Sequence, residues 1–317
     1  MKRLDEKEII RVFSQALGIA DDLDDVATVT GAGSRNLVFK ADMLVASTDV
    51  PPQMSPQQVA RKSIAACASD LAAKGARPVA AMIALGLPAD ITRAYVEGLA
   101  TGFQMASREF GVKIVGGDTN AAKYLVIDCS MIGSIAGKKV PRRDGARPGD
   151  SVVVSGKFGY PSSGLAVLLK GARAQGGFRK AAVDSALEPK PRQAFGTALA
   201  RYFSSSIDSS DGLAVSLYEI ATLSNVDIEI DPAAASAEGV QEFAVANNLD
   251  AHELVFHGGE EYEIVATVPK SLLSKAKAAA EKAGCDFYVI GSVKKGGGKV
   301  TAGKKHLLEN RGYLHFS

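Results

Sequence analysis

The chain has 317 residues, 46% of them hydrophobic and 23% charged, so it is long enough for two globular domains and too apolar to be disordered. Lys and Arg total 37 and Asp and Glu total 35, and this net charge of +2 argues against a nucleic-acid-binding protein. No apolar stretch approaches the roughly 18 residues that cross a bilayer, which argues against a membrane protein. The N-terminal residues do not resemble a signal peptide, and the three cysteines lack C-x-x-C spacing. Both features predict a cytoplasmic protein.

The first part of the chain predicts two helices and a strand. Apolar residues recur at helical spacing over residues 5–17, which predicts the first helix. Residues 36–47 are rich in Val, Leu and Phe and predict a strand. The Ser-Pro dipeptide at 55–56 is typical of a helix start, and this helix is expected to end near residue 75.

The next part predicts a helix and two strands. The helix is expected over residues 92–110, where five apolar side chains share one side. Strands follow at 113–115 and 124–135. The intervening sequence GGDTN, residues 116–120, predicts a turn between them because glycine and asparagine favour turns.

The charged segment 137–150, rich in Gly and Pro, predicts a boundary between two domains, residues 1–138 and 139–317. Because strands and helices alternate in both halves, we expect two domains of the α/β or α+β class. In the second domain we expect a strand at 151–155, a glycine-rich turn, and helices at 163–170, from 209–213 onward, and at 271–283.

Several aspartates lie among small uncharged residues, and Asp70 is the clearest of them. It is the only charged residue between Ser63 and Ala73, in a predicted helix of mainly small or apolar residues. Such a helix is expected to be buried, and a buried carboxylate needs a cation or hydrogen bonds. The alternative is a carboxylate that caps a loop or pairs with Lys74.

Other aspartates have equally open interpretations. Asp118, in VGGDT, is expected at the carboxyl end of a strand, where glycines would let a ligand approach, although VGGDT is also an ordinary turn sequence. Asp208 and Asp211 flank the start of a predicted helix, which either could simply cap. Asp24 and Asp25 could belong to a solvated acidic loop.

Together these aspartates predict a site for hard divalent cations, because Mg²⁺ prefers carboxylate and phosphate oxygens. The four histidines are scattered in the sequence, so zinc or iron is not expected. The common nucleotide-binding motifs are absent from the sequence. Phosphate could instead be held by backbone N–H groups of the glycine-rich turn at 156–159 and the helix start after it.

Seven short motifs occur in order between about residue 20 and residue 313. They are LDDVATV (23–29), ADMLV (41–45), SDLAAKGARP (69–78), GGDT (116–119), RDGARPGD (143–150), IDSSDGL (207–213) and GGEEYE (258–263). In this order they resemble the thiamine-monophosphate kinase family, part of the ATP-binding superfamily of aminoimidazole ribonucleotide synthetase. The resemblance implies an N-terminal α/β domain that dimerises through its sheet into a homodimer, and a C-terminal α/β sandwich domain. ATP and several Mg²⁺ ions would lie in the cleft between them.

The resemblance also implies roles for individual residues. The metal ligands would be Asp24, Asp25, Asp42, Asp70, Asp118, Asp208 and Asp211, and the catalytic residues among them would be Asp70, Asp118, Asp208 and Asp211. ATP would contact Gly117, Asp118, Arg143 and Ser210. Thiamine monophosphate would contact Asp49, Glu260 and Tyr313, with Asp49 in a place where many bacterial members have a histidine.

The implied reaction is the ATP-dependent phosphorylation of thiamine monophosphate to thiamine diphosphate. The acceptor phosphate is already an anion, so no base is needed to create the nucleophile. Repulsion is the main obstacle, about 4 kcal/mol for two unit charges 4 Å apart at an effective dielectric of 20, and bound cations would offset it. Two alternatives stay open: a sister enzyme of the superfamily with another small phosphorylated acceptor, and a non-catalytic nucleotide-binding module.

Overall fold

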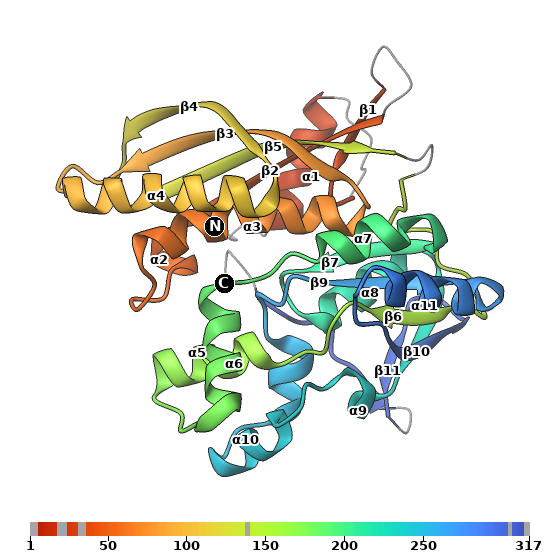
Figure 1. The fold of residues 1–317 in the computed structure, drawn as a ribbon. Helices are drawn as coiled ribbons and strands as arrows, with labels where there is room; N and C mark the ends of the chain where they lie inside the picture. The colour runs from red at the N-terminus through yellow and green to blue at the C-terminus, as the bar shows by residue number, and fades with distance from the viewer. Residues whose placement is uncertain (1–5, 18–23, 31–35, 137–139, 304–305, 314–317) are drawn as a thin grey trace.

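The computed structural model describes residues 6–17, 24–30, 36–136, 140–303 and 306–313. Two β-sheets are each packed against helices, and helix α3 (Pro56–Ala73) lies between the two halves (Figure 1). The two-domain α/β fold predicted from the sequence is therefore confirmed. The predicted boundary after residue 138 lies outside the described residues and stays a prediction.

The N-terminal half contains a five-stranded sheet with one covered and one open face. Its strands are β1 (Ala27–Thr30), β2 (Asn36–Val45), β3 (Arg77–Leu87), β4 (Lys113–Ala121) and β5 (Val126–Ile135). They lie in the order β1-β2-β5-β3-β4, and helix α4 (Arg93–Phe110) connects the parallel pair β3 and β4. Helices α3 and α4 lie against the same face (Figure 1). The other helices of this half are α1 (Glu6–Leu17) and the short α2 (Ala46–Asp49).

Local sequence explains why α3 begins where it does. The Ser55 hydroxyl accepts the Gln58 N–H at 3.3 Å, the Gln58 side chain accepts the Ser55 N–H at 3.0 Å, and Pro56 occupies the first turn. Ile64 and Leu71 are fully buried in the core between α3 and the sheet. This packing fixes the rotation of α3 about its axis.

The C-terminal half is a seven-stranded sheet with helices on both faces. Its strands are β6 (Ser151–Val154), β7 (Ser205–Ser209), β8 (Val226–Ile230), β9 (Glu263–Val268), β10 (Tyr288–Lys295), β11 (Val300–Ala302) and β12 (His306–Leu307), in the order β12-β11-β8-β10-β6-β9-β7. Along β6, Val152 and Val154 belong to one core and Val153 to a second core on the opposite face. The predicted C-terminal sandwich is therefore confirmed.

Helices of this half differ in the face that they cover. Helix α8 (Leu213–Leu223) contributes to the first core, and α7 (Gln193–Leu199) and α11 (Leu273–Lys282) contribute to the second. The remaining helices and helical turns are α5 (Tyr160–Lys170), α6 (Gly176–Leu187), α9 (Pro232–Ala235), α10 (Val240–Ala246), η1 (Ala200–Tyr202), η2 (Glu253–His257) and η3 (Lys270–Leu272). None of the helices in the described ranges combines the length and the apolar character that a bilayer-spanning segment requires.

The last turn of α3 belongs to the core of the C-terminal half. Ala72 and Ala73 are fully buried there beside Phe195 of α7. A Cβ atom added at Gly196 would lie 1.8 Å from the carbonyl oxygen of Ala72, so α7 can approach α3 this closely only with glycine at that position. Helix α3 therefore packs into the core of the N-terminal half and into the second core of the C-terminal half, and it fixes how the two halves meet.

The structure contradicts the turn predicted for GGDTN. Residues 116–120 continue β4, which pairs with β3 as far as Ala121, so Asp118 lies inside a strand and not after one. A Cβ atom added at Gly117 would lie 1.9 Å from the carbonyl oxygen of Ile83 on β3. Gly117 thus permits a close approach of two strands. From sequence alone, a glycine that serves this purpose cannot be distinguished from a glycine in a turn.

Several element boundaries also differ from the prediction by a few residues, and two of them show a local cause. The strand expected to reach residue 47 ends at Val45, because α2 begins at Ala46. The helix expected from residue 163 begins at Tyr160, directly after Gly159, whose φ of 111° is accessible mainly to glycine.

Candidate active site between the two halves

Three buried carboxylates from distant parts of the chain meet where the two halves touch. Asp25 lies in the bend before β1, Asp70 in the last turn of α3, and Asp208 in β7. Each residue is at most 6% exposed, and one carboxylate oxygen from each lies within 4.8 Å of the other two. The structure thus brings these three predicted residues together, and we call them the carboxylate cluster.

Three cationic side chains lie directly against this cluster, and the first two are Lys40 and Arg143. Lys40 of β2 places its Nζ 2.9 Å from an oxygen of Asp70 and 3.6 Å from an oxygen of Asp42. Arg143 donates from its Nε to Asp25 at 2.9 Å. Asp42, also predicted as a metal ligand, is therefore connected to the cluster through Lys40.

Lys74 connects the cluster to the C-terminal half. Its side chain is fully buried, and its Nζ lies 2.6 Å from Asp24 and 2.8 Å from Asp25. The same ammonium donates to the carbonyl oxygen of Ser206 in β7 at 2.6 Å. The alternative pairing of Asp70 with Lys74 is therefore wrong, because Lys74 is occupied by the acidic pair that precedes β1.

Burial and neighbouring charges shift the pKa values of all three carboxylates in the cluster. Burial raises the pKa of Asp70 well above its usual range, and repulsion from Asp208 adds to the shift. Burial, followed by repulsion from Asp25, raises the pKa of Asp208 to about 6. Burial also acts on Asp25, but the attraction of Lys74 and Arg143 outweighs it, and the pKa of Asp25 is lowered. A further cation would relieve the repulsion that remains.

The raised pKa of Asp208 predicts how pH changes stability in the absence of divalent cations. Its pKa is about 6 in the folded protein against a usual value of 3.8, so ionisation of Asp208 opposes folding. Its stabilising contribution is complete below about pH 4 and is lost as the pH rises through about 6. Asparagine does not ionise, so the Asp208→Asn variant does not lose this stability as the pH rises. The melting temperature of the variant minus that of wild type, measured in EDTA, should therefore increase from about pH 4 to about pH 7, and a constant or decreasing difference would contradict the shift.

A second group of predicted residues converges on Lys62 of α3. The Nζ of Lys62 lies 2.5 Å from an oxygen of Glu260 and donates to the carbonyl oxygen of Asp49 at 2.6 Å. Burial raises the pKa of Tyr313, and the negative charges of Asp49, Glu260 and Asp211 add to the shift. The Tyr313 N–H also donates to the carbonyl oxygen of Asp211 at 3.1 Å. The three predicted substrate contacts and Asp211 thus lie together, and with Lys62 we call them the Lys62 group.

The loop that carries Glu260 is held in an unusual backbone conformation. Glu260 and Tyr262 have φ values of 70° and 52°, in the left-handed region that non-glycine residues rarely adopt. The Glu260 N–H donates to the carbonyl oxygen of Ser210 at 2.6 Å, and the Tyr262 N–H donates to that of Ser209 at 2.8 Å. These bonds attach the loop to the turn between β7 and α8, which contains Ser210, a predicted ATP contact. Such strain is frequent at functional sites.

The structure does not bring Asp118 to the carboxylate cluster. Asp118 is exposed on the edge strand β4, in one row of the sheet with Ala84 of β3 and Met43 of β2. Neighbouring residues of a strand face opposite sides, so Asp118 lies on the face away from α3, whereas Asp42 lies on the α3 face. Gly117, beside Asp118, is in the row of Asp42.

Two of the four histidines lie close together in the structure, although the sequence predicts no histidine cluster. The π-helical turn η2 puts one ligand atom each of His252, Glu253 and His257 within 4.8 Å of one another, a proximity that the spacing of five residues does not suggest. The Glu253 carboxylate is paired with Arg311, and the Nδ1 of His257 lies 2.9 Å from the carbonyl oxygen of Arg311. These contacts explain the arrangement without a metal.

Sequence reasoning missed Lys40 and Lys62, two of the residues that neutralise the site, and considered Lys74 only as a partner of Asp70. Lys40, Lys62 and Lys74 are buried or half-buried, although lysine is usually exposed. The available signal was a lysine inside a segment of small, apolar residues, as at Lys74 in SDLAAKGARP. Tyr262, 6% exposed beside Glu260, was also missed, although the motif GGEEYE contains it.

Comparisons with known proteins define the class of the chain. Residues 23–135 match the N-terminal domain of the AIR synthase related proteins, and residues 147–303 match the C-terminal domain of the same proteins. The chain is therefore an AIR synthase related protein with both domains of that class.

Full-length relatives define the family within this class. A thiamine-monophosphate kinase of Nitrosopumilus maritimus is 39% identical over 322 residues, which is 100% of each chain. One from Pyrococcus horikoshii is 38% identical over 94% of this chain and 91% of its own. A solved structure, AaThiL complexed with AMPPCP and TMP, is 29% identical with a TM-score of 0.89 and covers 100% of this chain and 99% of that one. The chain belongs to the thiamine-monophosphate kinase family.

Proposed function

We propose that the protein transfers the γ-phosphoryl group of ATP to thiamine monophosphate and so forms thiamine diphosphate. The observation that carries this proposal is the carboxylate cluster, which is built from both halves and is suited to cations that let two phosphates approach. It is supported by the relatives named for this reaction and by the similar AaThiL structure, whose ligand AMPPCP is a non-hydrolysable analogue of ATP.

Mg²⁺ fits the donor atoms at the cluster. They are all carboxylate oxygens, one each from Asp25, Asp70 and Asp208, and all three residues are buried. Hard divalent cations prefer such donors. Bound Mg²⁺ would neutralise charge on the phosphates. The residues that we assign to several ions are Asp25, Asp70 and Asp208, with Asp24 and Asp42 beside them.

The nucleotide is expected between the cluster and the turn after β7. Arg143 already binds Asp25 and could also donate to a phosphate, and Ser210 and Asp211 lie on that turn. Gly117 and Asp118 stay predicted ATP contacts on β4. No general base is required, because the acceptor phosphate is already an anion near neutral pH.

A direct assay tests the proposed reaction. The purified protein is incubated with ATP, MgCl₂ and thiamine monophosphate, and the products are separated by chromatography. We expect thiamine diphosphate and ADP in equal amounts, and no product in EDTA. ADP formation that other phosphorylated acceptors stimulate and thiamine monophosphate does not would favour a sister enzyme. Nucleotide binding without any product would favour a binding module.

Lys62→Met is expected to weaken the acceptor site selectively. The substitution leaves Glu260 without its cationic partner and Asp49 without the donor to its carbonyl oxygen. We expect the KM for thiamine monophosphate to rise by about tenfold, the worth of one charge-assisted hydrogen bond, with the KM for ATP nearly unchanged. Initial rates at varied substrate measure both constants. Lys277→Met, on the exposed part of α11, is the control, and an equal rise of both KM values would contradict the assignment.

We also propose that the protein is a homodimer that pairs the open faces of the N-terminal sheets. Four apolar side chains on this face are 38–57% exposed: Phe39, Met43, Met82 and Val115. An exposed apolar patch of this kind is typical of an interface. Met82→Asp should therefore convert the dimer to a monomer in sedimentation analysis, with melting temperature reported alongside. A wild-type protein that sediments as a monomer would contradict this proposal.

The use of ATP further supports a cytoplasmic location.

A further inference from the structure

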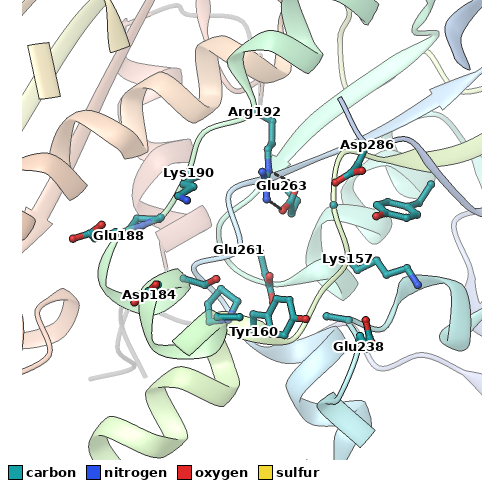
Figure 2. A pocket seen from close by; sticks show the side chains of 17 residues that line it. Lys157, Tyr160, Asp184, Glu188, Lys190, Arg192, Glu238, Glu261, Glu263 and Asp286 are labelled. Carbon is teal, nitrogen blue, oxygen red and sulfur yellow. Dashed lines mark hydrogen bonds and ion pairs between the residues drawn. The ribbon is translucent and has the colours of Figure 1, made fainter. Parts of the chain in front are cut away.

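A cavity of about 520 Å³ opens in the C-terminal half between α6, the segment that follows it, and the start of β10 (Figure 2). This volume lies in the range of small-molecule sites, about 300–1,000 Å³. Its lining includes no member of the carboxylate cluster and no member of the Lys62 group. The cavity is therefore separate from the proposed active site.

Glu261 is the buried acid of this cavity. It is 7% exposed, and its Oε1 accepts the Gly159 N–H at 2.7 Å. The turn that was expected to hold a phosphate is thus occupied, at Gly159, by a carboxylate of the protein itself. Within the described part of the chain, Oε2 of Glu261 has no hydrogen-bond or ion-pair partner, and the side chain lines the cavity (Figure 2). A buried carboxylate with one free oxygen indicates a missing cationic partner.

The charges around the cavity also indicate a cationic ligand. Six acidic and three basic side chains line it. Arg192 is engaged with Glu263 at 2.8 Å, and Lys157 lies 5.4 Å from the centre of the Tyr288 ring. Three lining carboxylates form no ion pair and accept no side-chain hydrogen bond among the described residues: Glu238, Glu261 and Asp286.

We propose that this cavity binds an aliphatic polyamine. The unpaired carboxylates, one buried and two exposed, supply counter-charges for more than one ammonium group. The half-buried rings of Tyr160 and Tyr288 supply apolar surface for the methylene chain and cation–π contacts for its ammonium groups. The excess of negative charge disfavours phosphate esters, so the site would not be a second site for the substrates.

Calorimetric titration with spermidine tests this proposal on the full-length protein, with saturating Mg²⁺ and no nucleotide. Glu261→Gln keeps the size of the side chain and an oxygen for the Gly159 N–H but removes the charge. We expect it to weaken spermidine binding by at least about tenfold, as for the loss of a charge-assisted hydrogen bond. Glu238→Gln, exposed at the cavity, should weaken it by a smaller factor. Glu281→Gln, exposed on α11, and Asp70→Asn should leave it unchanged.

Four results would overturn the proposal. They are no spermidine binding to wild type, equal binding to wild type and Glu261→Gln, loss of binding in Asp70→Asn, and tighter binding of inorganic phosphate than of spermidine. Weaker binding in Glu238→Gln with an unchanged melting temperature, together with a larger loss in Glu261→Gln, would support it even if the buried substitution also lowers stability. None of these readouts depends on turnover, so they test the cavity independently of the proposed reaction.

Discussion

Asp70→Asn is expected to lower kcat by about a thousandfold while the protein stays folded. The substitution removes the carboxylate that lies centrally in the cluster, between Lys40 and Asp208. A thousandfold loss corresponds to about 4 kcal/mol of transition-state stabilisation, a reasonable share for a lost cation ligand. In EDTA the melting temperature should be unchanged or higher, because burial and repulsion raise the pKa of Asp70 and its charge therefore opposes folding.

The measurement combines steady-state kinetics with thermal melting at several Mg²⁺ concentrations. A ligand that binds only the folded protein raises its melting temperature, so wild type should be stabilised by Mg²⁺ and Asp70→Asn much less. Asp90→Asn, an exposed aspartate outside the site, should behave as wild type in both measurements. Residual activity above about a tenth of wild type would remove Asp70 from the cation site.

Lys74→Met is expected to destabilise the protein by about 3–5 kcal/mol, the usual cost of leaving buried charges without a partner. The lysine is fully buried and lies against Asp24, Asp25 and the Ser206 carbonyl oxygen. Methionine fills a similar volume but supplies no charge and no donor. Both acids would then be held in a low-dielectric region with Arg143 as the remaining cation against Asp25. Urea denaturation in EDTA measures the loss directly.

Added Mg²⁺ should recover part of this loss in Lys74→Met, because a cation bound by Asp25 replaces some of the missing positive charge. Lys277→Met is the matched control, since it removes the same charge from an exposed position on α11. A loss below about 1 kcal/mol in Lys74→Met would mean that the acidic pair does not depend on this lysine.

Sequence reasoning succeeded where local chemistry determines structure. The Ser-Pro start of α3 was predictable because a capping box depends on residues that are close in sequence. The burial of Asp70 was predictable for a similar reason, since a helix composed of small residues has to be packed. The order of motifs then placed Asp25 and Asp208 in the same site.

Prediction failed where the decisive contact comes from a distant part of the chain. GGDTN reads as a turn until β3 is known to lie beside it, and the same pairing turns Asp118 away from the cluster. Whether Lys74 pairs with Asp70 or with Asp24 and Asp25 depends on the path of a loop far away in sequence. The free oxygen of Glu261 likewise depends on the position of α5.

The shared helix α3 has a consequence for how the chain can be divided. Its first turns pack under the N-terminal sheet, and its end is buried among α7 and α11 of the other half. Neither half would form its complete interior if expressed as a separate fragment, because each would lack or expose part of this helix. We therefore expect calorimetry to record one concerted melting event for both halves, and a substitution anywhere along α3 to be transmitted to each of them.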